Sequence, residues 1–100
     1  MTLLTDTEIE QRLTQLGQWK RGEGASVAGD AIVREWKLAD FAAAIAFVDR
    51  VAQAAEAANH HPDILVHGWN KVRLTLSTHS EGGLTDADFA LAGEIDCLAA

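Results

Sequence analysis

The segment Val72–Thr78 alternates apolar and polar residues, and this alternation constrains the fold more than any other feature of the sequence. Val72, Leu74 and Leu76 lie on one face of an extended chain, while basic and hydroxyl side chains lie on the other. Such a pattern is typical of an antiparallel sheet that packs one face against a core. We therefore predict a sheet with one covered face and one more polar face.

Signals for a helix appear close to the N-terminus. Thr5 and Glu8 have the spacing of a capping box, in which each side chain bonds the backbone of the other. Apolar residues then repeat at helical spacing until Gly17, which supplies a stop. The first helix is therefore predicted from about Asp6 to Leu16.

A second helix is expected after Asp40, whose carboxylate can cap it. Alanines fill much of the segment that follows, and they favour helix intrinsically. The apolar positions at alternating spacings of four and three should face the core, widened by three neighbours: Phe41, Ile45, Val48, Ala52 and Ala55, with Phe47, Val51 and Ala54. A helix so rich in small residues can also build a subunit interface.

The last helix is expected to follow Gly82-Gly83, with Thr85 as its cap and Asp88 at the third position. Four strands are predicted between the helices, the first two joined by the glycine-rich segment 22–29: Trp19–Glu23, Ala31–Lys37, Ile64–Trp69 and Val72–Thr78. This element order predicts an α+β domain spanning residues 1–100, with a four-stranded antiparallel sheet and three helices packed on one face.

Charge and composition limit the classes of partner. Eight Lys and Arg residues are outnumbered by fifteen Asp and Glu residues, and the formal charge of −7 argues against direct nucleic-acid binding. Cys97 is alone, so a reducing compartment is the simpler expectation. The first residues lack the features of a signal peptide, and no segment is apolar enough to span a membrane. We therefore expect a soluble cytoplasmic protein.

Two adjacent histidines stand where the second helix must stop. Pro62 cannot continue a helix and pushes His61 toward an extended backbone, which ends the helix around Asn59 or His60. Adjacent residues that leave a helix point in different directions, so two proton-transfer groups can enter one pocket from different angles. Glu56 precedes His60 by four residues and shares its helical face.

A third histidine, His79, follows the alternating strand segment, so all three fall at the ends of regular elements, where sites are usually built. A metal site is not predicted, because the neighbours His60 and His61 cannot both easily face one ion and no Cys pair exists. Trp69 is read most simply as a core or rim residue, although it can also lie near a flat ligand.

These motifs together resemble one protein family. Glu56-x3-His60-His61-Pro62-Asp63, Trp69-Asn70-Lys71-Val72, Leu76-x-Thr78-His79 and Gly83-Leu84-Thr85-x2-Asp88 are similar to the pterin-4a-carbinolamine dehydratases, and the similarity covers almost the whole chain. The family usually has tyrosine at the position of Trp69. The resemblance implies removal of water from 4a-hydroxytetrahydropterin to give quinonoid dihydropterin, in the recycling of tetrahydrobiopterin. It implies no metal or organic cofactor, and a homodimer or homotetramer.

The resemblance also suggests roles for individual residues. His60, His61 and His79 are expected to be catalytic, with His60 and His79 as acid and base and His61 orienting the pterin. Glu56 is expected to fix the His60 imidazole, and Asp88 to orient His79 or simply to cap its helix. The remaining residues assigned to substrate binding are Pro62, Trp69 and Thr78.

A second function stays open on the same scaffold. An oligomeric interaction module, acting as a coactivator or an assembly chaperone, would use an exposed helical face and would not need the histidines. Retention of all three histidines favours the enzyme, because a pure scaffold has no physical need for them together.

Overall fold

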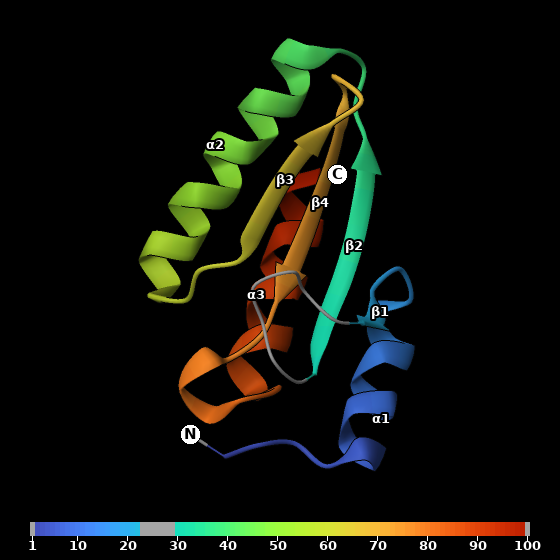
Figure 1. The fold of residues 1–100 in the computed structure, drawn as a ribbon, viewed down its shortest axis with the longest axis vertical. Coiled ribbons are helices and arrows are strands. Elements are labelled where there is room, and N and C mark those ends of the chain that lie inside the picture. The colour runs from blue at the N-terminus through green and yellow to red at the C-terminus, as the bar shows by residue number, and fades with distance from the viewer. Residues whose placement is uncertain (1, 23–29, 100) are drawn as a thin grey trace.

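The computed structural model describes residues 2–22 and 30–99, which form three α-helices, one short 3-10 helix (η1) and one four-stranded sheet. The elements follow one another as α1 (Asp6–Leu16), β1 (Lys20–Gly22), β2 (Ala31–Lys37), α2 (Phe41–Ala58), β3 (Asp63–His67), β4 (Lys71–Leu76), η1 (His79–Glu81) and α3 (Asp86–Ala99). All strand pairs are antiparallel, in the order β1-β2-β4-β3. The predicted α+β class is confirmed (Figure 1).

One face of the sheet carries the core. Val72, Leu74 and Leu76 are fully buried, as their alternation predicts. They join a single cluster to which every α-helix contributes, with α2 and α3 packed against each other and α1 against α3. The opposite face is less open than predicted, because Thr75 and Ser77 are also buried.

The strand ends differ from those predicted. β1 is confined to Lys20–Gly22, so the predicted strand begins one residue too early, at Trp19. Glu23 and the rest of the predicted turn fall in residues 23–29, outside the described residues. β3 begins at Asp63 and ends at His67, because Gly68 and Trp69 take positive φ angles of 56° and 60° and turn the chain. β4 ends at Leu76, two residues early.

The buried face of α2 was predicted incorrectly in part. Ala44, Phe47, Val51 and Ala55 are the buried residues, whereas Phe41 and Ile45 are 54% and 38% exposed. The buried residues follow the predicted helical spacing, but the buried face is rotated about the helix axis from the predicted face. Alanine occupies so many positions that two faces of this helix are almost equally apolar, and only packing against α3 and the sheet decides between them.

Two connections bring distant parts of the chain to one end of the sheet. α2 ends at Asn59, which takes a left-handed conformation with φ 50°, and the chain then enters β3 through Pro62. β4 continues into η1 at the same end, because Asp63 pairs with Thr75 (Figure 1). No helix among the described residues is long and apolar enough to cross a bilayer.

Candidate active site

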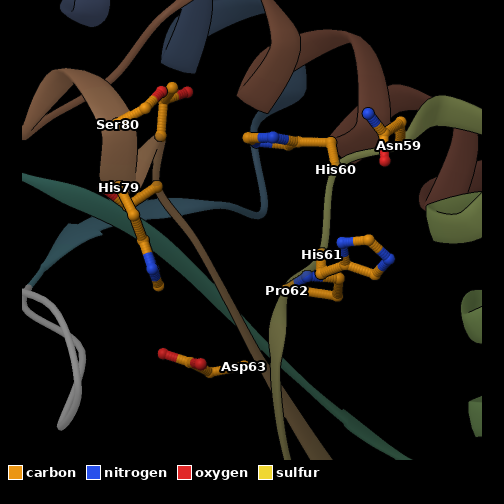
Figure 2. Close-up of a pocket in the computed structure, with 9 residues that line it drawn as sticks. Asn59, His60, His61, Pro62, Asp63, His79 and Ser80 are labelled. Atoms are coloured by element: carbon orange, nitrogen blue, oxygen red, sulfur yellow. The ribbon is translucent and has the colours of Figure 1, made fainter.

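A cleft of about 320 Å³ lies between the α2–β3 connection and the β4–η1 connection (Figure 2). Its two walls come from segments well separated in the sequence. The residues that line it are Asn59, His60, His61, Pro62, Asp63, Ser77, Thr78, His79 and Ser80. All three predicted catalytic histidines therefore line one cleft.

His60 forms the inner wall and is held by a buried carboxylate. Its Nε2 atom lies 2.6 Å from Oδ1 of Asp88, at the start of α3. The His60 side chain is 14% exposed and the Asp88 side chain is fully buried. The prediction that Asp88 orients His79 is therefore wrong in its partner, because the carboxylate contacts His60 instead.

The second oxygen of Asp88 anchors the carboxylate within the protein. Asp88 Oδ2 accepts hydrogen bonds from the Thr78 hydroxyl at 2.8 Å and from the backbone N–H of Thr85 at 2.9 Å. Since Thr78 donates to Asp88, the Thr85 hydroxyl donates to Thr78, across 2.7 Å. Thr78 thus holds Asp88 in place. The same carboxylate caps α3, as predicted, and holds the His60 ring.

This arrangement leaves one ring nitrogen of His60 for chemistry. An ionised carboxylate can only accept hydrogen bonds, and Asp88 already accepts two. The tautomer of His60 that carries its proton on Nε2 is therefore favoured, because it donates a third bond to Asp88. Nδ1 is then the atom free to exchange a proton with a ligand in the cleft. Partners of this kind fix both the tautomer and the orientation of a histidine.

His79 lines the opposite wall, at the first position of η1 (Figure 2). Its ring points into the cleft, toward the side on which Asp63 presents its carboxylate. Asp63 was not predicted as a site residue. The signal available in the sequence was its place directly after Pro62. In the structure Asp63 lies on the same sheet face as Thr75, at the end of β3 where the cleft opens.

His61 lies at the outer rim. Its side chain is 58% exposed, and its ring is turned away from those of His60 and His79 (Figure 2). His61 Nε2 lies 2.8 Å from Oε1 of Glu56. The predicted contact of Glu56 with His60 is therefore wrong: the chain leaves helical geometry at Asn59, so the spacing of four no longer aligns the two side chains.

Trp69 is not brought to the cleft. It lies in the β3–β4 turn, whereas the cleft lies where β3 begins (Figure 1). Pro62 lines the cleft next to His61. Sequence reasoning missed Asn59, Ser77 and Ser80, which also line it, because single polar residues in connections carry no spacing signal.

Within the described residues, no group of three or more His, Cys, Asp and Glu side chains is placed to hold a metal ion. Two histidines of the cleft are paired with carboxylates that do not line it, His60 with Asp88 and His61 with Glu56.

Comparison with known proteins identifies the family. The family model described as pterin 4 alpha carbinolamine dehydratase matches residues 2–98. The chain belongs to the pterin-4a-carbinolamine dehydratase family. The relatives of this family include a "Putative pterin-4-alpha-carbinolamine dehydratase" of Chloroflexus aurantiacus, 51% identical over 96% of each chain. A protein of Nocardia farcinica with the same name is 52% identical over 97% of this chain and 95% of its own.

Solved structures of the family share the fold. The structure described as a transcriptional coactivator/pterin dehydratase from Brucella melitensis has a TM-score of 0.86 and 33% identity, covering 99% of this chain and all of the other. A pterin dehydratase-like protein described as a RuBisCO assembly factor in the alpha-carboxysome has a TM-score of 0.67 and 25% identity, covering 82% and 89%.

Proposed function

We propose that the protein is a 4a-hydroxytetrahydropterin dehydratase, which converts the carbinolamine to quinonoid dihydropterin and water. The observation that carries the proposal is the pairing of His60 with buried Asp88 on one wall of a cleft whose other wall holds His79. The membership of the dehydratase family supports the same reaction. The pathway would be the recycling of tetrahydrobiopterin in the cytoplasm.

The reaction needs one proton at the departing hydroxyl and loss of another from the neighbouring ring nitrogen. In our proposal His60 removes the ring proton through Nδ1, because Asp88 holds its Nε2–H. His79, on the opposite wall, delivers a proton to the hydroxyl. Histidine suits both tasks near neutral pH, and positioned acid–base catalysis contributes roughly 10²–10⁴-fold.

The other residues would bind rather than react. His61, at the rim with Glu56, would contact and orient the pterin. Pro62 would keep the connection extended, so that His60 and His61 stay on different sides of the backbone. Thr78 would act through Asp88 and not on the substrate.

The direct test is to generate the carbinolamine chemically and to follow quinonoid dihydropterin with and without the purified protein. Because dehydration also proceeds unaided, the uncatalysed rate is the baseline. We expect acceleration proportional to the protein concentration. A rate equal to the baseline at every concentration of folded protein would exclude the proposal.

An interaction module is the alternative function, and the exposure of Phe41 and Ile45 on α2 favours it. The descriptions of the two structural relatives, a coactivator and an assembly factor, also point to such roles in those proteins. Substitutions on α2 would then abolish function while His60→Ala would not. A scaffold could use Asp88 to cap α3, but it has no need for an imidazole that the same carboxylate holds in one orientation at the wall of a cleft, and this pairing favours chemistry.

A further inference from the structure

Asp63 lines the cleft and has no part in the proton transfers proposed above. It is the first residue of β3, partly buried, and its carboxylate faces the interior of the cleft (Figure 2). The carboxylates of Asp88 and Glu56 contact histidines and do not line the cleft. Among the described residues that do line it, Asp63 alone is acidic. The cleft therefore presents one negative charge to a ligand.

The shape of a carboxylate suits one kind of ligand group. Its two oxygens accept two parallel N–H donors at once, and this bidentate geometry adds both strength and selectivity. A pterin carries such a pair on its pyrimidine ring, where N3–H and an N–H of the 2-amino group point the same way. The histidines of the cleft cannot accept both bonds, since a neutral imidazole offers only one acceptor nitrogen.

We propose that Asp63 binds the pyrimidine edge of the pterin, accepting from N3–H and from the 2-amino group. The contact would select pterins over pteridines that lack the amino group. Because the ligand is the proposed substrate, this assignment rests on the proposed function. Asp63 adds a binding contact and no step to the reaction.

The arrangement of the side chains around the cleft fits this orientation. In a pterin, N5 and the 2-amino group lie at opposite ends of a line through C4a and C2. Figure 2 shows His60 and Asp63 at opposite ends of the cleft, with His79 on the flank between them. A pterin whose pyrimidine edge meets Asp63 therefore brings N5 toward His60 and the 4a hydroxyl toward His79. These are the two places at which the reaction exchanges protons.

The backbone holds Asp63 firmly in this position. Asp63 pairs with Thr75 in the β3–β4 ladder, and the ring of Pro62 fixes the backbone just before it. Thr75 is buried, and His79 follows it four residues later along the chain. The ladder thus ties the wall that carries Asp63 to the wall that carries His79. A preorganised backbone lowers the entropy lost when a ligand binds.

Binding of two stable, fluorescent pteridines tests this contact without any turnover. Pterin and lumazine share their ring system and differ at C2, where pterin has the amino donor and lumazine a carbonyl acceptor. A carboxylate would place a second acceptor against that carbonyl. At a pH at which both ligands are neutral, we expect the unmodified protein to bind pterin at least about tenfold more tightly than lumazine in a fluorescence titration.

Asp63→Asn should remove or reverse this preference with almost no change in the shape of the side chain. The amide offers one acceptor and one donor, which match N3–H and the 2-carbonyl of lumazine but oppose the 2-amino group of pterin. Pterin should therefore bind at least about tenfold more weakly, and lumazine at least as tightly as before. Asp63→Ala, the second variant, removes the contact for both ligands and should bring the two affinities together.

Asp49→Asn is the matched control, because Asp49 is exposed on α2 and does not line the cleft. It should leave both affinities unchanged, and urea unfolding should show that each variant is folded. Equal affinities of the unmodified protein for pterin and lumazine would overturn the proposal, and so would no measurable binding of either. An unchanged preference for pterin in folded Asp63→Asn or Asp63→Ala would overturn it as well.

Turnover of the carbinolamine separates this contact from the proposed function. Asp63→Asn should raise KM at least about tenfold and lower kcat less, because the lost contact is present in the ground state and the transition state alike. If the unmodified protein prefers pterin through Asp63 but does not accelerate dehydration, the proposed function fails and the pterin contact stands. If it accelerates dehydration without that preference, the proposed function stands and the contact is refuted.

Discussion

Asp88 has two roles, accepting the hydrogen bonds of Thr78 and Thr85 and holding the Nε2–H of His60. Replacing Asp88 by Asn separates these roles with almost no change in the shape of the side chain. The Oδ2 position must hold an oxygen, because the backbone N–H of Thr85 and the hydroxyl of Thr78 both donate to it. The amide oxygen will therefore occupy that position, and the amide N–H group will face Nε2 of His60. That contact requires a bare Nε2, so the ring proton moves to Nδ1, where our proposal needs a lone pair.

The expected cost in stability is moderate. Thr78 and Thr85 keep an acceptor, but the hydrogen bond of Asp88 to His60 exchanges a carboxylate for an amide. Loss of a charge-assisted bond in a fully buried place costs about 1–3 kcal/mol of the free energy of unfolding. The catalytic loss should be larger, about 10²-fold in kcat, because the variant removes positioned base catalysis.

The two effects are measured separately. Urea unfolding gives the stability, dehydration of chemically generated carbinolamine gives kcat, and ¹⁵N NMR of the imidazoles reports which His60 nitrogen carries the proton. Thr78→Val is the matched control, since it removes one bond to Asp88 without imposing the other tautomer. An Asp88→Asn variant that is folded and turns over at the unmodified rate would refute the role of Nδ1.

Further variants test the rim of the cleft, the Glu35–His67 pair at the other end of β3, and the end of α2. Glu56→Gln should change the free energy of unfolding by less than about 0.5 kcal/mol, because the Glu56–His61 pair is exposed. His61→Ala should raise KM severalfold. A large loss of stability in Glu56→Gln with an unchanged KM in His61→Ala would contradict the role of His61 at the rim. The hydrogen bond with His67 lowers the pKa of Glu35 from its ordinary 4.5, so the Glu35 carboxylate stabilises the fold above that pH and the benefit is lost on acidification. Glu35→Gln should therefore unfold more easily in urea at pH 7, by less than about 1 kcal/mol, with the difference vanishing at low pH; a difference that persists in acid would contradict this. Asn59→Ala should lower the thermal stability by about 1 kcal/mol and Asn59→Gly should not, because the residue has φ 50°; equal effects would contradict the strain.

The fold was largely predictable because its elements are marked locally. The boundaries of α1, β2 and the caps of the helices follow from side chains within a few residues, such as Thr5 and Asp40. The buried face of α2 was not predictable, since alanines make its faces alike and the choice depends on packing with α3. The early end of β3 depends on a tryptophan in a left-handed conformation, which local propensity disfavours.

The members of the site were more predictable than their contacts. The motif gave His60, His61 and His79, which do line one cleft. Their carboxylate partners were predicted wrongly: Glu56 contacts His61 and not His60, and Asp88 contacts His60 and not His79. The left-handed turn at Asn59 redirects His60 and His61 after the helix ends. No spacing rule relates Asp88 to a histidine 28 residues earlier, so that pairing needed the tertiary structure.

The central claim is that His60 and His79 act on one substrate from opposite walls of the cleft. It is tested most directly by turnover of the carbinolamine by His60→Ala, His79→Ala and the double variant, all verified as folded. The account predicts at least a tenfold loss in each single variant, and a double loss smaller than the product of the two, since both groups serve one step. Full turnover by either single variant would contradict it.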